Sequence, residues 1–386
     1  PEGLQGAYLT FLTPDGQKEI DAPSPCQIIG NPDGGYVKVS GSDTPIKHLI
    51  VATTIIDAAA AAHVTGLPAI AALSLRNHSL LVPPECTTVT IAAEKGKLGM
   101  RAAEALAYRL IYFGLRVSIA YVPKKDGCWA DALSSNDAVF KQFKDCLSDP
   151  EPFEPAEDDL RALPAGDFVR VPFPPQVPLC GPWLQTRSLV MLHAERGAGK
   201  TWLALAVAQA VATGTPLLGW PCDNPRKVLY IDGELPGDLI QDRLHLLSDN
   251  GPLSPNLRIL SPDLLQLRGH SMPDLGDRHG REALDEEIER ENYGLIFLDS
   301  ISTLVLTGVE NDAASWAPLQ AWSVKHRSRG RTLMFLHHDN RKGAPRGTSK
   351  KEDVLDTMVG LKPCGFEDNA SIFELSFSKH RRFFGA

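Results

Sequence analysis

One stretch in the middle of the chain limits its possible folds more than any other. Residues 188–193 have the apolar run of a buried strand, residues 194–201 form a short polar loop, and residues 202–210 favour a helix. Glycine at positions 197 and 199 lets the backbone turn its amides toward an anion, and the helix N-terminus adds positive potential there. The stretch therefore predicts an α/β domain with an anion site at the end of a strand.

The side chains of this loop suit a nucleoside triphosphate. The loop matches the phosphate-binding pattern GxxxxGK[ST], except that Ala194 stands where the first glycine is expected. Lys200 supplies a charge for the β- and γ-phosphates, and Thr201 supplies a hydroxyl for Mg²⁺. We therefore predict ATP and Mg²⁺ as cofactors. The predicted nucleotide contacts are Arg196, Gly197, Ala198, Gly199, Lys200, Thr201 and Trp202.

Two later strands end in acids that could complete the site. Residues 293–299 deliver Asp299 at the C-terminal end of a strand, where ligands gather in open α/β sheets, so we predict that it binds the magnesium ion. Residues 228–232 lead to Glu234, the predicted base that orients the attacking water. The alternative is a solvated acid at a strand end. Asp232 is the weaker candidate for the base, because strand alternation turns it toward packing.

Strands and helices alternate on both sides of an acidic, proline-rich stretch at 149–178. Proline removes a donor and blocks helices, so we expect an extended linker there, or alternatively a long surface loop. The predicted domains are therefore 1–148, a small parallel sheet, and 179–386, a second α/β domain. Residues 7–12 and 36–39 are expected to form a hairpin. The predicted strands are 48–52, 69–73, 89–93, 117–121, 188–193, 228–232, 295–299, 332–336 and 372–379, and the predicted helices 56–63, 99–113, 200–213, 236–248, 281–291 and 315–329.

Composition excludes several classes of protein. The 386 residues suffice for two domains, 43% are hydrophobic, and no apolar run reaches the roughly 18 residues of a membrane helix. Pro1-Glu2-Gly3 lacks the basic start of a signal peptide, so we expect a cytoplasmic protein without a membrane partner, and a natural chain that begins before Pro1. The seven cysteines form no CxxC pair, which argues against a disulfide framework or a zinc site. The net charge of −8 requires any nucleic-acid contact to come from a local patch.

The order of motifs in residues 180–386 resembles the RecA-like hexameric ATPases. After the phosphate-binding loop come YIDGE, LIFLDS and FLHHDN, in the manner of the plasmid replicative helicase RepA and, more distantly, DnaB. The resemblance implies a homo-oligomeric ring, a hexamer, that hydrolyses ATP and moves on single-stranded DNA in the replication of a plasmid, phage or mobile element. It makes Glu234 the catalytic base and the pair His337 and His338 a γ-phosphate sensor, with His338 the nearer contact. Alternatively, the two histidines are a pair at a strand end near the surface, without a role at the nucleotide. A primase or a replication initiator would be a further partner.

Two basic segments fit the same resemblance. Residues 321–351 hold nine lysines and arginines and one aspartate, and the family places this loop beside the DNA channel. Lys379 and Arg381 fit a Lys-x-Arg pair that reaches the neighbouring subunit's ATP. The alternatives are a solvated basic loop and a plain basic C-terminal segment. The predicted DNA contacts are Arg341, Lys342, Arg346, Lys350 and Lys351.

The first 148 residues resemble a Toprim domain, the fold of bacterial primases and topoisomerases, through residues 7–16, 48–74, 89–110 and 126–133. Toprim chemistry needs a glutamate after the first strand and a DxD after the third. Thr53 and Glu94-Lys95-Gly96 stand at those positions here, and only Glu94 and Asp131 keep a carboxylate.

The resemblance therefore predicts a degenerate Toprim domain with a structural or DNA-docking role, because two metal ions need more carboxylates than these. Two rival functions remain open. One is an active primase–helicase in which Glu94 and Asp131 still hold metal, and the other is a RecA-like regulatory switch that does not translocate on DNA.

Overall fold

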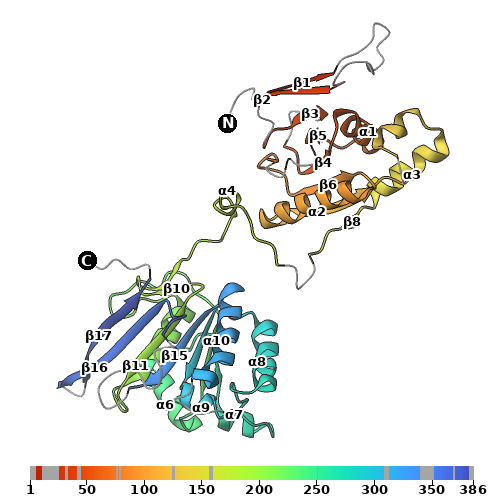
Figure 1. Ribbon diagram of the computed structural model, residues 1–386. Helices are drawn as coiled ribbons and strands as arrows, with labels where there is room; N and C mark the ends of the chain where they lie inside the picture. The colour runs from red at the N-terminus through yellow and green to blue at the C-terminus, as the bar shows by residue number, and fades with distance from the viewer. Residues whose placement is uncertain are drawn as a thin grey trace. The chain divides into compact units, whose positions relative to one another are not determined.

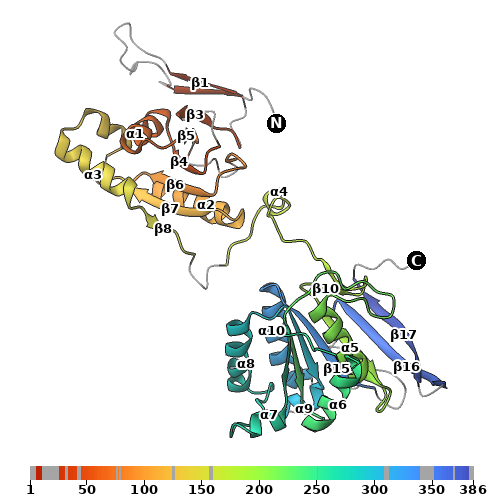
Figure 2. The same cartoon turned by 180° about the vertical axis from the view of Figure 1, so that it is seen from behind.

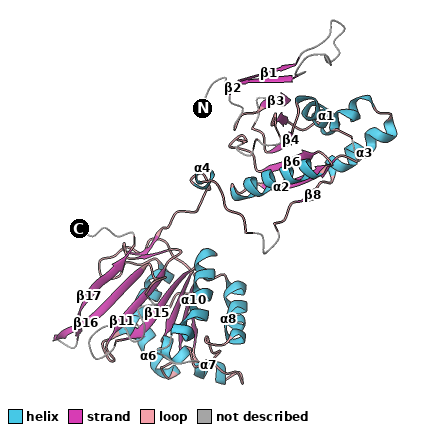
Figure 3. Ribbon diagram, viewed as in Figure 1, coloured by secondary structure: helices cyan, strands magenta, loops and turns pink. Residues whose placement is uncertain are grey.

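The chain divides into two compact units, Pro1–Pro174 and Pro175–Ala386 (Figure 1). Each unit has its own sheet, and the α/β class predicted from the sequence is confirmed (Figure 3). The computed structural model describes residues 6–10, 26–30, 34–40, 45–74, 77, 80–123, 127–155, 160–249, 251–307, 313–339, 352–367 and 370–381.

The first unit is built on a six-stranded sheet of order β3-β5-β4-β6-β7-β8, in which the four inner strands are parallel and the two edge strands antiparallel. Beside it, β1 and β2 pair as a separate antiparallel ribbon. The elements of this unit are β1 (Gly6–Thr10), β2 (Cys26–Gly30), β3 (Val37–Ser40), β4 (His48–Ala52), α1 (Ile55–Thr65), β5 (Ala69–Ala71), β6 (Thr88–Ala93), α2 (Lys97–Tyr112), β7 (Arg116–Tyr121), η1 (Trp129–Ser134), α3 (Asp137–Ser148), β8 (Glu151–Pro152) and α4 (Ala165–Phe168).

Helices cover both faces of this sheet. The side chains of β4, β6 and β7 alternate between a core under α2 and a core under α1 and α3. Helix α1 begins at the Thr54 cap, whose hydroxyl accepts from the Asp57 amide, and ends at Gly66 in the left-handed region. Its buried face is mostly alanine, and these short side chains let the helix pack closely on the strands. This arrangement confirms the predicted alternation of strands and helices.

The predicted hairpin between residues 7–12 and 36–39 is wrong. Strand β1 pairs with β2, and residues 37–40 form β3 at the edge of the main sheet, antiparallel to β5. The hydrophobic pattern marked the strands correctly but carried no information about their partners, because pairing depends on the whole sheet.

Part of the stretch predicted as a linker contacts the first unit. Strand β8 pairs with β7, and Asp167 in α4 forms a buried ion pair of 2.9 Å with Arg109 of α2. The division at residues 148 and 178 stays a prediction.

The second unit has a seven-stranded sheet of order β13-β12-β14-β15-β11-β16-β17 (Figure 2). Six strands run parallel and β17 is antiparallel, and β9 and β10 form a small ribbon. The elements are β9 (Pro178–Cys180), β10 (Leu184–Gln185), β11 (Leu189–Ala194), α5 (Lys200–Thr213), β12 (Val228–Asp232), α6 (Gly237–Leu247), β13 (Leu257–Leu260), α7 (Pro262–Gln266), α8 (Arg278–Glu291), β14 (Leu295–Asp299), α9 (Ile301–Leu304), α10 (Ala313–Ser328), β15 (Thr332–His338), β16 (Thr357–Glu367) and β17 (Ala370–His380).

This sheet is buried on both faces. Helices α5 and α6 pack on one face, and α8, α9 and α10 pack on the other. The central strands are therefore continuous apolar runs, as parallel strands covered on both sides usually are. The predicted strands at 228–232 and 295–299 and the helix at 200–213 are confirmed to the residue. The second unit is an α/β domain in which a glycine-rich loop joins β11 to α5.

Two further observations bear on the sequence expectations. Across the residues that the structure describes, no helix is long and apolar enough to cross a membrane. Six of the seven cysteines are free thiols, namely Cys86, Cys128, Cys146, Cys180, Cys222 and Cys364.

Candidate functional site

The predicted site residues of the second unit meet at the carboxyl ends of four neighbouring strands. The sheet register places Asp232 beside Asp299, and Ala194 beside His338. Because β11, β15, β14 and β12 lie side by side, the loops that follow them share one edge of the sheet. Ligands of open α/β sheets bind at this edge.

The phosphate-binding loop has the conformation that its glycines permit. Gly197 and Gly199 have φ of 77° and 93°, in the left-handed region, and a Cβ added at either would meet no described atom within 4 Å. The backbone angle, rather than crowding, therefore requires glycine at both positions. Helix α5 begins with Gly199 as its cap and has no side-chain cap among the described residues. Its first amides are available to an anion.

The departure from the glycine pattern at Ala194 has a structural reason. Ala194 is still in β11, fully buried in the core under α5. Its carbonyl accepts hydrogen bonds from the Lys200 ammonium and from the Asp339 amide, both at 2.9 Å. An extended residue in a strand does not need the freedom of glycine.

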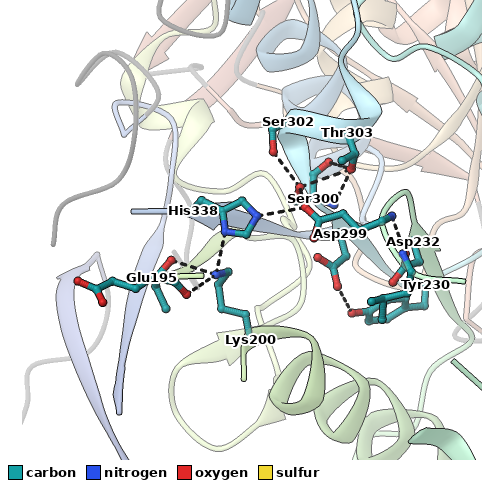
Figure 4. A network of polar contacts seen from close by, with 12 residues as sticks. Glu195, Lys200, Tyr230, Asp232, Asp299, Ser300, Ser302, Thr303 and His338 are labelled. Carbon is teal, nitrogen blue, oxygen red and sulfur yellow. Dashed lines mark hydrogen bonds and ion pairs between the residues drawn. The ribbon is translucent and has the colours of Figure 1, made fainter. Parts of the chain in front are cut away.

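A chain of polar contacts joins Lys200 to Glu234 through His338. Figure 4 shows Lys200 and His338 pointing toward one another. The Lys200 Nζ donates to the carbonyls of Ala194 and Glu195 and lies 3.1 Å from the His338 Nδ1. The His338 Nε2 lies 3.1 Å from the Glu234 Oε1. The ends of β11, β12 and β15 are therefore connected directly.

The partners fix the form of the imidazole. An ammonium can only donate, so the His338 Nδ1 must accept, and a carboxylate can only accept, so the His338 Nε2 must carry the proton. The geometry describes a neutral histidine with its proton on Nε2. Moving the Lys200 side chain toward a phosphate would remove the donor to Nδ1, so the histidine is placed to respond to what occupies the loop.

Glu234 has a second partner in Ser300. The Ser300 Oγ donates to the Glu234 Oε1 at 2.5 Å. Burial favours the neutral acid, but the hydrogen bonds from Ser300 and His338 outweigh it and hold the pKa of Glu234 below its ordinary value. The side chain is therefore an ionised carboxylate, which is the form that accepts a proton.

Thr201 and Asp299, the two predicted metal ligands, are in contact. The Thr201 hydroxyl bonds to the Asp299 carboxylate, which also accepts from the Tyr230 hydroxyl at 2.7 Å. Burial, followed by repulsion from Asp232, raises the pKa of Asp299 to about 7. A cation bound beside this carboxyl group would stabilise its ionised form.

The donor set fits a magnesium ion bound with a nucleotide. The Asp232 Oδ2 is buried and has no hydrogen-bond partner among the described residues, and it lies in the strand beside Asp299. A cation or its ordered water would pair both acids. No group of three His, Cys, Asp or Glu side chains within the described residues is arranged to hold a metal by itself. Mg²⁺ commonly takes one or two protein ligands and completes its shell with phosphate oxygens and water.

Burial disfavours the charge of Lys200. The residue is 6% exposed, and burial lowers its pKa even though Asp299, Asp339 and Glu234 attract the ammonium. A triphosphate at the loop would bring further negative charge to the side chain and stabilise its ionised form.

The other predicted residues are placed as follows. Arg196 is exposed at the tip of the loop. Trp202 is 37% exposed, and the Arg243 guanidinium of α6 lies 5.1 Å from its ring centre.

Lys379 and Arg381 contact the backbone of residues 352–353, and Arg381 also lies 3.3 Å from Asp356. They lie away from the site of their own chain, at the opposite end of the sheet. The predicted DNA contacts at 341–351 fall outside the described residues.

In the first unit, the predicted Toprim positions include Thr53 and Glu94, which contact one another. Burial first, and then Asp57, raise the pKa of Glu94, and the Thr53 hydrogen bond opposes them. The carboxylate of Asp131 instead accepts from the Cys128 amide at the start of η1. The two acids that kept their carboxylates thus serve different local structures.

Sequence reasoning missed Ser300, Tyr230 and the pair His193–Asp339, whose ring nitrogen and carboxylate lie 2.8 Å apart. Strand alternation could have found Tyr230, since it shares a face with Asp232. Nothing in the spacing of Ser300 or Asp339 indicates its partner, because each contact joins strands far apart in sequence.

Comparisons with known proteins find a matching sequence family and distant structural similarities. Residues 154–344, just under half of the chain, match the sequence family described as an AAA domain. A search of curated proteins finds no match. Among solved structures, a KaiC-like protein from Pyrococcus horikoshii is 14% identical with a TM-score of 0.36, covering 53% of this chain and 84% of that one. The flagellar accessory protein FlaH from Methanocaldococcus jannaschii is 16% identical with a TM-score of 0.36, covering 50% and 79%.

Proposed function

We propose that the second unit is a magnesium-dependent ATPase whose catalytic base is Glu234. The observation that carries the proposal is the chain of contacts from Lys200 through His338 to Glu234, with Thr201 and Asp299 bonded beside it. A phosphate loop alone indicates binding. An ionised carboxylate linked to that loop indicates hydrolysis as well.

Each residue of the site has a distinct part in this proposal. Lys200 exchanges its carbonyl partners for the β- and γ-phosphates, and the amides of the loop and of α5 orient the same groups. Glu234 orients water and accepts its proton. Ser300 holds one oxygen of that carboxylate in place. Thr201 and Asp299 would hold the magnesium ion, which supplies charge neutralisation during phosphoryl transfer.

His338 is proposed as the residue that reports occupancy of the loop. It touches both Lys200 and Glu234, so a change at either side chain alters its hydrogen bonds. It also ends β15, directly before Asp339 and the basic residues at 340–351. In the sequence, the nucleotide site therefore leads directly into the predicted DNA-binding loop.

Assembly and DNA binding are proposed on the resemblance of the motifs. Lys379 and Arg381 lie at the end of β17, opposite the phosphate loop, so in their own chain they do not serve its nucleotide. In a ring they would serve the neighbouring copy's nucleotide. The basic residues at 341–351 would bind single-stranded DNA, which makes the chain a hexameric translocase or helicase in replication, with a degenerate Toprim-like first unit.

The experiment is steady-state ATP hydrolysis by the full chain, with and without magnesium and with and without single-stranded DNA. Magnesium-dependent hydrolysis stimulated by the DNA is expected. Hydrolysis without stimulation would contradict the translocase and favour a regulatory ATPase. No hydrolysis under any of these conditions would contradict the ATPase.

A further inference from the structure

A cavity of about 310 Å³ lies in the second unit at the end of the sheet opposite the phosphate loop. It is bounded by Ser188, which precedes β11, by Thr357, which begins β16, and by His380, which ends β17. Strand β11 runs from this cavity to the phosphate loop at its other end, so the cavity is separate from the nucleotide site of the same chain.

Arginines dominate the charge of the cavity wall. Arg187, Arg327 and Arg381 line it, and Asp356 is the one acid among its described lining residues. The three arginines come from separate elements: the turn before β11, the last turn of α10, and the residue after β17. A wall that carries three guanidinium groups and one carboxylate has an excess of positive charge.

Asp356 forms no short bond with Arg327 or Arg381. Its Oδ2 accepts from the Leu189 amide at 2.9 Å, while Arg327 and Arg381 lie 3.4 Å and 3.3 Å from its oxygens. Charge-assisted hydrogen bonds between guanidinium and carboxylate are usually about 2.7–2.9 Å long. The carboxylate gives its short bond to the backbone. Arg381 also donates to the Asp353 carbonyl at 2.7 Å and Arg327 to the Val354 carbonyl at 3.4 Å, and a guanidinium group has five N–H donors, so each keeps donors for another acceptor.

The neutral polar groups of the wall are bonded within the fold. The Ser188 hydroxyl donates to the Gln185 carbonyl and the Gln185 amide to the Pro182 carbonyl, so the arginines are the groups of this wall that suit an oxyanion. Arg187 has φ of 57°, a left-handed conformation that residues other than glycine rarely adopt. Such outliers are retained where surrounding structure holds them, and they are common at ligand sites.

We propose that this cavity binds a phosphate group, with Arg327 and Arg187 as its main ligands beside Arg381. Guanidinium groups recognise phosphate oxygens with paired hydrogen bonds, and several of them together match the charge of a doubly ionised phosphate. The phosphate comes either from a free polyphosphate or nucleotide in solution or from a nucleotide held by a second copy of the chain.

The first arm tests a free ligand. Inorganic pyrophosphate is titrated calorimetrically into the Lys200→Ala chain. This substitution weakens binding at the phosphate loop, so that the signal comes from the cavity. Binding is expected, weakened about tenfold or more by adding Arg327→Ala, and weakened less by adding Arg187→Ala. Arg327→Lys keeps the charge and should restore part of the affinity. Arg329→Ala is the matched control, because Arg329 pairs with Glu289 outside the cavity, and it should leave binding unchanged. Thermal melts confirm that each variant is folded.

The second arm tests a nucleotide on a second copy, and it rests on the proposed ATPase. Arg327→Ala should hydrolyse ATP at least tenfold more slowly than the Arg329→Ala control. Mixing Arg327→Ala chains with Lys200→Ala chains should restore hydrolysis, because one copy contributes the phosphate loop and the other the cavity. The unmodified chain is assayed alongside. If it does not hydrolyse ATP, the ATPase proposal is wrong, and the pyrophosphate titration alone tests the cavity. Either arm succeeding supports the cavity, and the absence of any effect of Arg327→Ala in both overturns it.

Discussion

The two sheets carry acids at the same kind of edge but use them in different ways. In the first unit, Asp57 follows β4 and is buried, where it accepts from the Thr54 hydroxyl at 2.7 Å and from the Ala130 amide at 2.9 Å. In the second unit, Asp299 ends β14 and contacts Thr201, Tyr230 and the neighbouring acid Asp232.

The difference lies in what balances each charge. Asp57 is engaged with local donors that close a helix start and fix η1. Asp299 and Asp232 repel one another, and one oxygen of Asp232 has no partner among the described residues. An acid that is satisfied by the fold contributes stability, whereas buried acids that repel one another are typical of a functional site. The shared architecture therefore does not imply shared chemistry.

The largest effect is expected from Lys200→Ala. ATP hydrolysis should fall to background, because Arg196, the other cation of the loop, is exposed at its tip and cannot replace the charge at the β- and γ-phosphates. The fold should survive, since burial already lowers the pKa of Lys200 and the substitution removes a charge that the interior disfavours. Hydrolysis is measured by phosphate release and folding by thermal melting. A variant that hydrolyses ATP near the parent rate would move the site elsewhere.

A pair of substitutions sharpens the comparison. Asp299→Asn should remove magnesium-dependent hydrolysis and leave the free energy of unfolding unchanged or higher, because the amide keeps the shape without the repulsion. Asp57→Ala should do the opposite: normal hydrolysis, with a stability loss of about 1–3 kcal/mol from the orphaned Ala130 amide and Thr54 hydroxyl. Chemical denaturation and phosphate release measure the two quantities. Equal losses of stability in both variants would break the distinction.

Substitutions in the predicted DNA-binding loop are expected to have a smaller effect. Replacing Arg341, Lys342, Lys350 and Lys351 with alanine should weaken single-stranded DNA binding and flatten its salt dependence. The slope of log K against log salt should change by about 0.7 for each phosphate that the variant no longer neutralises. Fluorescence anisotropy at several salt concentrations measures this slope. A slope that does not change would leave the loop a solvated surface and shift attention to the first unit.

The smallest effect is expected at the Toprim-like positions. Glu94→Gln should change neither Mn²⁺ binding nor any activity of the full chain. Two metal ions need several carboxylates. Beside Glu94 lie Thr53 and Asp57, and Asp57 is already bonded to Thr54 and Ala130, while Asp131 caps η1. Titration of Mn²⁺ into the Asp299→Asn chain and its Glu94→Gln derivative tests this. Tight binding that Glu94→Gln abolishes, or primer synthesis by the chain, would restore the active primase.

The sequence predicted the second unit better than the first. The long apolar runs at 228–232 and 295–299 and the helix at 200–213 were placed correctly because local pattern and tertiary burial agree there. Strand β3 was given the wrong partner, and β13 and β16 were not predicted. Short or half-exposed strands have weak periodicity, and their place depends on neighbours distant in the chain.

The sequence predicted which residues form the site, but not which of them contact one another. Lys200, Thr201, Asp299, Glu234 and His338 were chosen from motif and strand-end position, and the structure brings them together. That Ser300 holds Glu234, or that Asp356 satisfies two arginines only in part, depends on distances of a few tenths of an ångström between separate elements. Sequence spacing carries no such information.

The central claim is that Glu234 turns a nucleotide-binding loop into a hydrolytic site, and single-turnover hydrolysis by Glu234→Gln tests it most directly. The variant keeps the shape of the side chain and its contacts to Ser300 and His338, so ATP affinity measured by a fluorescent analogue should stay within about twofold of the parent. The hydrolysis rate should fall by about 10²–10⁴-fold, the usual contribution of a general base. A reduction of less than about threefold with unchanged affinity would contradict the assignment and place the base elsewhere.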